Sequence, residues 1–203
     1  MDTNTLVVHG LGWFVVFVFS TCLHEAAHAL TAWRLGDPTA YRAGQVTLNP
    51  VPHIRREPIG MVIAPILIFI LTRGGFMIGW AHAPYDPRWA TQHPRRAALM
   101  ALAGPAANLL LVLISFAMLR YGLTTGYFDA PTHTSLSMTG LARAAEGTTA
   151  SALATIISLF FSLNLLLLVF NLIPVPPLDG ASIVPLFLPG RMIDGYTRFM
   201  YQS

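Results

Sequence analysis

Hydrophobic residues along this 203-residue chain gather in long runs, and three of the runs have the length of a membrane-spanning helix. Residues 11–35, 97–119 and 152–173 each reach the roughly 20 residues that a helix needs to cross the hydrocarbon of a bilayer. Between the last two, residues 128–150 are polar and rich in Thr, Ser and Gly, which predicts a loop in solvent. The pattern predicts an all-α polytopic membrane protein with three transmembrane helices.

A fourth apolar stretch, residues 59–81, is more irregular. Arg73-Gly74-Gly75 divides it into two halves that are each short for a crossing, and Pro65 lies in the longer half. The stretch fits either an irregular crossing or a membrane re-entrant region, a hairpin that enters the membrane and returns. Residues 181–203 carry an apolar patch too short to span, which predicts a segment on the membrane surface.

The composition agrees with a membrane protein and narrows the function. Charged residues make up 10% of the chain, against about 25% in soluble proteins. The basic residues are all arginines, and they are spread through the loops, so no nucleic-acid interface is expected. No linker or repeat divides the sequence, which predicts a single domain over residues 1–203.

The first apolar run contains the sequence His24-Glu25-Ala26-Ala27-His28, which reads HExxH. Two histidines four residues apart share one face of a helix, and the glutamate stands beside them. This arrangement suits a zinc ion held by two imidazoles, with a carboxylate near enough to take a proton from water at the metal. The motif predicts a hydrolytic metal site at membrane depth.

A zinc site of this kind needs a third protein ligand and an open position for water. Asp179 is the acidic residue close to the end of a later apolar run, and three prolines separate it from that run. Prolines stop a helix, so the chain can turn back and point the carboxylate inward. Alone, Asp179-Gly180 would equally fit a plain turn. Together with HExxH it predicts Asp179 as the third zinc ligand.

The meeting of Asp179 with the two histidines also constrains the topology. The first and third spans must then end on the same side, so residues 36–96 begin and end on the cytosolic side and residues 59–81 re-enter without a net crossing. The arginines on the side so assigned outnumber those on the other, as expected for a cytosolic surface. They are Arg34, Arg42, Arg55, Arg56, Arg88, Arg95 and Arg96, whereas Arg73, Arg120 and Arg143 lie elsewhere. We expect a multi-pass protein of the cell membrane with its active site toward the cytoplasm.

Three segments together resemble the signature set of the site-2 protease family of intramembrane zinc metalloproteases. They are HEAAH at 24–28, AGPAANLLL at 103–111 and NLIPVPPLDG at 171–180. The similarity covers most of the chain in the family's order, because it extends to LGDPTA at 35–40, VTLNPVPHI at 46–54 and GWAHAPYDP at 79–87. The chain looks most like the compact members that lack a PDZ domain.

The resemblance implies one zinc ion per chain, with His24, His28 and Asp179 as its ligands and Glu25 as the general base. It also implies that Asn171 projects toward the active site, where its amide is a candidate donor to the oxyanion of the reaction.

Two further residues are candidates for support of the active site. The resemblance places Asn108 on the helix packed beside the site, and His53 lies in a loop that could approach it. Hydrogen bonding between helices is an alternative role for Asn108 and for Asn171, and orientation of a loop is the alternative for His53.

The implied activity is hydrolysis of a peptide bond within or near a transmembrane segment of a membrane-protein substrate. Such a segment must unwind before its carbonyls can be reached, because a helix hides them in hydrogen bonds. We expect residues 42–48 to form a short edge strand that holds the opened segment by β-augmentation. Lipid is the other expected partner, nucleic acid is not, and the oligomeric state is left open.

Two other functions fit parts of the sequence. A metal-ion transporter would also place His and Asp in its spans, but it should carry ionisable residues along several helices. A non-catalytic scaffold that binds membrane helices would not need Glu25.

Overall fold

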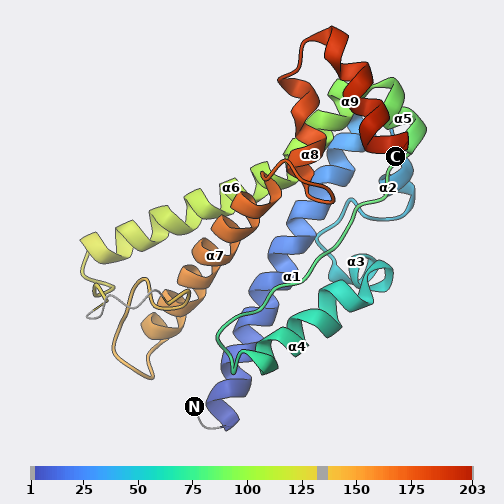
Figure 1. Cartoon of the computed structure of the whole chain (residues 1–203). Coiled ribbons are helices and arrows are strands. Elements are labelled where there is room, and N and C mark those ends of the chain that lie inside the picture. Colours follow the sequence, from blue (N-terminus) through green and yellow to red (C-terminus); the bar gives the residue numbers. More distant parts are fainter. Residues whose placement is uncertain (1–2, 132–136, 203) are drawn as a thin grey trace.

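A computed structural model describes residues 3–131 and 137–202, and this part of the chain is mostly helical (Figure 1). Its long helices are α1 (Thr3–Arg34), α6 (Pro94–Thr124) and α7 (Thr149–Asn171). All three are long and apolar enough to cross a membrane, and they coincide with the three predicted spans. The prediction of an all-α chain with three such helices is confirmed within the described residues.

The three long helices form a bundle that opens toward one end. α6 and α7 are an antiparallel pair, and both contact α1, mainly through its second half (Figure 1). α6 approaches α1 closely because its buried face carries small residues, including Ala97, Ala101 and Gly104, at helical spacing. This contact brings the middle of α6 against the HExxH segment of α1.

The end of α1 is fixed by a glycine. Gly36 adopts a positive φ of 110°, a conformation that glycine reaches without steric cost. The backbone N–H of Asp37 then donates to the carbonyl of Ala32, and the N–H of Gly36 donates to that of Trp33. This Schellman arrangement satisfies the last carbonyls of α1 and ends the helix shortly after the HExxH motif.

Residues 59–81 form a hairpin and not a continuous helix. A π-helical turn, η1 (Ile59–Ile63), leads into α4 (Ala64–Leu71), which runs beside α1 (Figure 1). The chain then reverses where Arg73 and Gly74 both have positive φ, and residues 76–86 return in an extended conformation. The N–H of Trp80 donates to the carbonyl of Gly60 (3.1 Å), so the stretch begins and ends at the same level of the molecule.

The expected edge strand at residues 42–48 is not confirmed. Arg42 instead ends the short helix α2 (Thr39–Arg42), and turns and bends follow. The reason lies in Gly44, whose φ of 70° reverses the chain. The N–H of Gln45 donates back to Ala40 and that of Gly44 donates to Tyr41, so these groups close the helix and are not available to a strand.

Most of the remaining short helices gather around the C-terminal end of α1, whereas residues 50–56 lie lower, beside the start of the hairpin (Figure 1). The remaining short helices are α3 (Pro50–Arg56), α5 (Pro87–Gln92), α8 (Asp179–Ile183), η2 (Val184–Leu186) and α9 (Gly190–Gln202). α9 is amphipathic: Ile193 and Thr197 are buried, whereas Met192 and Phe199 are exposed. An amphipathic helix with exposed apolar side chains fits the expectation of a surface segment.

We expect Gly79→Ala to destabilise the protein through this hairpin. A Cβ at position 79 would collide with the carbonyl of Gly60 and crowd Pro65 and Phe17 at 2.8–2.9 Å. Overpacking of this kind costs about 1–3 kcal/mol, so the thermal unfolding midpoint in detergent should fall. Gly12→Ala is the matched control, because a Cβ there meets nothing within 4 Å. Equal midpoints for the two variants would contradict the close packing of the hairpin.

Candidate metal centre

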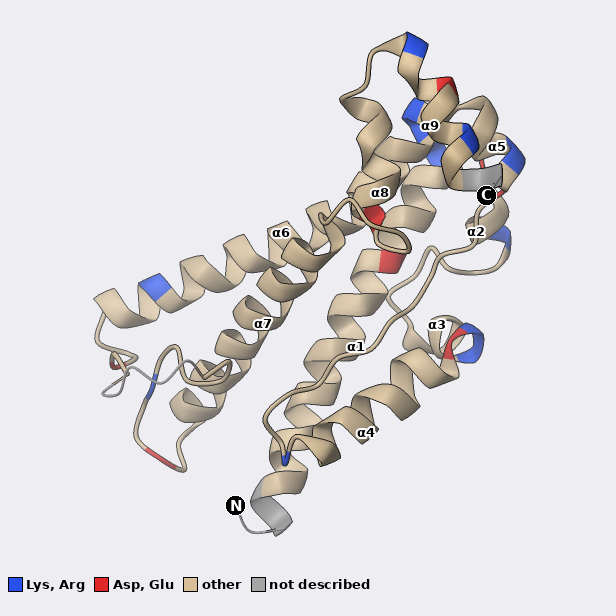
Figure 2. Cartoon of the chain, in the orientation of Figure 1, with Lys and Arg blue, Asp and Glu red and all other residues tan. Residues whose placement is uncertain are grey.

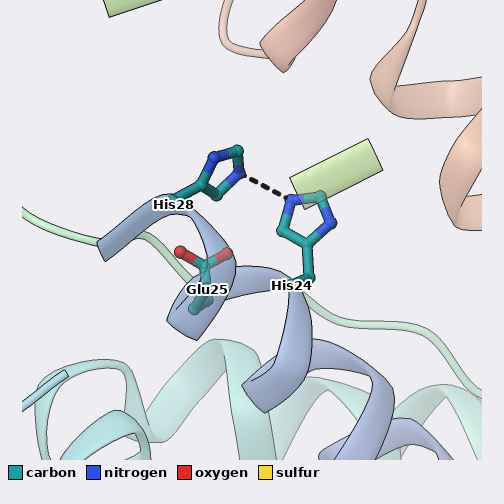
Figure 3. Close-up of side chains that lie close together, drawn as sticks. All are labelled: His24, Glu25 and His28. Carbon is teal, nitrogen blue, oxygen red and sulfur yellow. Dashed lines mark hydrogen bonds between the residues drawn. The ribbon is translucent and has the colours of Figure 1, made fainter. Parts of the chain in front are cut away.

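His24 and His28 lie one turn apart in α1, where their side chains project to the same side (Figure 3). Both residues are buried, at 7% and 6% exposure, and their rings meet edge to face. The two Nε2 atoms are only 2.9 Å apart. The helical spacing therefore does what the HExxH pattern predicts and turns two nitrogen lone-pair sites toward one point.

Asp179 is brought to the same point from the far end of the chain. Its Oδ2 lies 3.0 Å from Nε2 of His24 and 3.3 Å from Nε2 of His28. The next residue, Gly180, sits so close to the carbonyls of Leu172 and Ile173 that a Cβ would collide with them. The glycine thus allows the chain after α7 to fold back tightly and set Asp179 at the start of α8.

Glu25 stands beside the histidines with an unsatisfied carboxylate. The residue is 4% exposed, and its Oε2 is buried with no hydrogen-bond partner in the described structure. Its carboxylate and the two imidazoles offer atoms that lie within 4.8 Å of one another (Figure 3). A buried carboxylate without a donor is costly unless a cation or water completes it.

The three converging atoms fit the ligand set of a zinc ion. Nδ1 of His28 donates to the carbonyl of Met100 (2.8 Å), which leaves Nε2 of the neutral ring with a free lone pair. Oδ2 of Asp179 is a second acceptor and has no hydrogen-bond donor of its own. Nε2 of His24, Nε2 of His28 and Oδ2 of Asp179 make three mutual contacts. One proton could satisfy only one of these contacts, whereas a metal ion would satisfy all three. In tetrahedral zinc sites such donors lie about 3.3 Å apart, close to the spacing observed.

Electrostatics agree with a cation at this point. Burial alone would raise the pKa of the Asp179 carboxyl, but positive charge beside it, at the position of the His28 ring, would lower that pKa well below its usual range. The position between the three side chains therefore stabilises positive charge.

Gly104 leaves the space that a metal would need. It lies on the α6 face that meets α1, and a Cβ there would contact Nε2 of both His24 and His28. Any larger side chain would occupy the point on which the lone pairs converge. The sequence motif contained this glycine, but its role becomes visible only when α6 is placed against α1.

A cavity of about 750 Å³ opens onto the site. Its walls come from α1, from the extended return of the hairpin, from α6 and from the turn between α7 and α8. The lining includes Trp80, His82, Tyr85 and Asn171 together with the histidines, Glu25 and Asp179. The side chains that converge on the metal position are therefore accessible from a cavity large enough for a short extended peptide.

The other predicted site residues occupy three different settings. Asn108 is fully buried, and its Oδ1 lies 2.5 Å from Nδ1 of His24. Asn171 lines the cavity from the last residue of α7. His53 is not among the residues that line the cavity; its Nε2 contacts the carbonyl of Thr47, which orients a loop.

Asn164 of α7 was missed as part of the site by sequence reasoning. Its side chain is fully buried and accepts a hydrogen bond from Asn108 (2.8 Å). The available signal was a polar amide in the middle of an apolar span, which is uncommon in lipid.

The family model of Peptidase family M50 matches residues 12–197, which include the whole of this site. The chain belongs to Peptidase family M50. This is the site-2 protease family of zinc metalloproteases, as the resemblance of the sequence motifs predicted.

Individual relatives of this M50 chain agree with the family assignment. YwhC of Bacillus subtilis (strain 168), named as a zinc metalloprotease, is 34% identical over 176 residues, which are 86% of this chain and 68% of YwhC. Rip2 of Mycolicibacterium smegmatis, named likewise, is 36% identical over 169 residues, 83% of this chain. Rip2 of Mycobacterium tuberculosis (strain H37Rv) is 36% identical over 179 residues, 88% of this chain. The chain spans 52% and 56% of the two Rip2 proteins, respectively. No solved structure matches it.

We expect Gly104→Ala to reduce zinc binding by this M50 chain. The added methyl group would contact Nε2 of both histidines, so zinc affinity should fall by at least about the 10–100-fold that changes around a metal site cause. Metal analysis of the purified protein across a series of zinc-buffered solutions measures it. Ala106→Ser adds one heavy atom on an exposed position of the same helix and should bind zinc as the parent does. Equal affinity in the Gly104→Ala variant would show that the metal does not lie beside α6.

Proposed function

We propose that this chain is an intramembrane zinc endopeptidase that hydrolyses a peptide bond within or near a transmembrane segment of a membrane protein. The observation that carries the proposal is the convergence of three acceptor atoms, from His24, His28 and Asp179, beside the unpaired carboxylate of Glu25. These residues lie on or next to helices of membrane-spanning length, in a member of a zinc metalloprotease family.

His24, His28 and Asp179, which all line the cavity, would hold one zinc ion per chain. A bound zinc ion would supply a Lewis acid for the peptide carbonyl and would lower the pKa of water at the site to about 7. Glu25 has its Oε2 free to accept the proton of the attacking water and later to deliver it to the leaving amine.

Asn171 would stabilise the negative charge that develops on the peptide carbonyl oxygen. It lines the same cavity as the zinc-binding side chains and stands where α7 ends. An amide N–H aimed at that oxygen gives the preorganised donor that such a transition state requires.

The membrane arrangement follows from the charges and from the hairpin. Arginines gather around α2, α5 and α9, at the end of the molecule where α1 finishes, and further arginines lie at the end of α3, beside the start of the hairpin (Figure 2). We assign this end to the cytosol of a cell membrane because basic residues concentrate on cytosolic surfaces. The hairpin of residues 59–81 then enters the membrane from that side and returns, and residues 1–203 act as one domain.

Glu25→Gln should abolish cleavage of a model transmembrane substrate while zinc stays bound. The amide keeps the shape of the side chain but cannot accept the proton, and loss of a general base costs about 10²–10⁴-fold in rate. Cleavage is measured with purified, zinc-loaded protein in liposomes. Glu146→Gln, an exposed position before α7, is the matched control and should retain activity.

Persistent cleavage by the Glu25→Gln variant would refute the assigned base. Zinc flux into parent proteoliposomes without any cleavage would favour a transporter instead.

Asp179→Ala should lower zinc affinity by more than the roughly 10–100-fold that residues outside the ligand set cause. The variant removes one of the three converging atoms and leaves the two histidines alone. Asp194→Ala removes an exposed carboxylate from α9 and should leave zinc affinity, measured in the same zinc-buffered solutions, unchanged. An unchanged zinc affinity in the Asp179→Ala variant would overturn the third-ligand assignment.

A further inference from the structure

A buried chain of hydrogen bonds connects the backbone of α7 to the imidazole of His24. Nδ2 of Asn164 donates to the carbonyl of Phe160 (2.8 Å) and to Oγ of Ser20 (2.9 Å). Oδ1 of Asn164 accepts from Nδ2 of Asn108 (2.8 Å), and Oδ1 of Asn108 meets Nδ1 of His24 (2.5 Å). Asn108, Asn164 and Ser20 are all fully buried, so water does not compete for these bonds.

The carbonyl of Phe160 determines which group donates and which accepts in each of these hydrogen bonds. A backbone carbonyl can only accept, so the Asn164 atom that meets it must be the NH₂ group. The oxygen of the Asn164 amide then faces Asn108, which must present its own NH₂ group in return. That leaves only the oxygen of Asn108 to face the ring of His24.

We propose that Asn164 is a positioning residue that fixes the tautomer of His24. Because the oxygen of Asn108 accepts, Nδ1 of His24 carries the proton and Nε2 keeps its lone pair toward Asp179 and His28. The inference rests on the proposed zinc site for its purpose, whereas the proton on Nδ1 follows from the hydrogen bonds alone.

The ring of His28 is oriented more simply, by one backbone carbonyl in place of the Asn164–Asn108 hydrogen bonds. Its Nδ1 donates directly to the carbonyl of Met100, so one backbone atom fixes that ring. His24 lies one turn earlier in α1, at the level where α6 presents the Asn108 side chain. An isolated amide can rotate to offer either its oxygen or its NH₂ group, and the second choice would move the ring proton to Nε2, where it would block a metal. Asn164 removes that choice.

Two substitutions at Asn164 separate a positioning role from simple packing between helices. Asn164→Leu keeps a similar volume and removes all polarity, so the amide of Asn108 loses its orientation. Asn164→Asp, in its neutral buried form, still donates to Phe160 through its hydroxyl and accepts from Asn108 through its carbonyl, so it preserves the direction of these hydrogen bonds. Ser158→Ala is the matched control, since Ser158 is equally buried on α7 but, among the described residues, its hydroxyl bonds within its own helix, to Ala154.

Zinc affinity is measured for the full chain in lipid bilayers by competition with a chelator. We expect Asn164→Leu to weaken binding about 10–100-fold, and Asn164→Asp and Ser158→Ala to stay close to the parent. Parental affinity in Asn164→Leu, or equal losses in the Leu and Asp variants, would overturn the proposal, because packing alone would then explain the residue.

Nitrogen NMR of histidine-labelled, metal-free protein gives a second reading that needs no variant at position 164. His24→Gln identifies the His24 signals by difference. We expect the parent to show a protonated Nδ1 at His24, because that atom faces the oxygen of Asn108; an unprotonated Nδ1 would overturn the proposal. This result is independent of catalysis, so a failure of the proposed protease activity would leave it standing, and the reverse also holds.

Discussion

The structure depends on one constraint: polar atoms buried between apolar helices must be satisfied by the protein, because lipid offers no partners. Where α1, α6 and α7 meet, Nδ1 of each motif histidine faces an oxygen, from Asn108 or from Met100. The atoms left without donors, Oε2 of Glu25 and Oδ2 of Asp179, are acceptors. The two rings therefore donate their Nδ1–H groups to oxygens of the protein and direct their Nε2 lone pairs toward the cavity. Lone pairs that converge in this way attract a cation.

The hydrogen bonds from His24 and His28 to groups of α6 require α6 to come very close to α1. Small residues make this approach possible. The α6 face that meets α1 carries Ala97, Ala101 and Gly104 before it reaches Asn108. In lipid there is no hydrophobic drive between helices, so close contact and hydrogen bonds hold them together. The same missing side chain at Gly104 lets the backbones approach and leaves room beside both histidines. Helix packing and the space for a metal thus have a common origin.

The sequence was sufficient to predict a structural feature where one residue type has one physical consequence. Run length predicted three spans, helical spacing predicted that His24 and His28 share a face, and the prolines before Asp179 predicted a chain that turns back. It failed at residues 42–48, where turn residues on both sides suggested a strand but the positive φ of Gly44 closes a helix instead. It also missed Asn164, because a lone amide in a span has no meaning until its partners on two other helices are known.

The extended return of the hairpin reconciles hydrolysis with burial. A helix conceals its backbone groups in hydrogen bonds, so a wall made only of helices offers water its side chains alone. Residues 76–86 have no regular secondary structure, and several of them line the cavity beside Glu25. Irregular backbone is tolerated at membrane depth where it borders a polar cavity, since water can satisfy it there. The break at Arg73 and Gly74, which made residues 59–81 a poor membrane span, is therefore what gives the proposed zinc site a wall that water can wet.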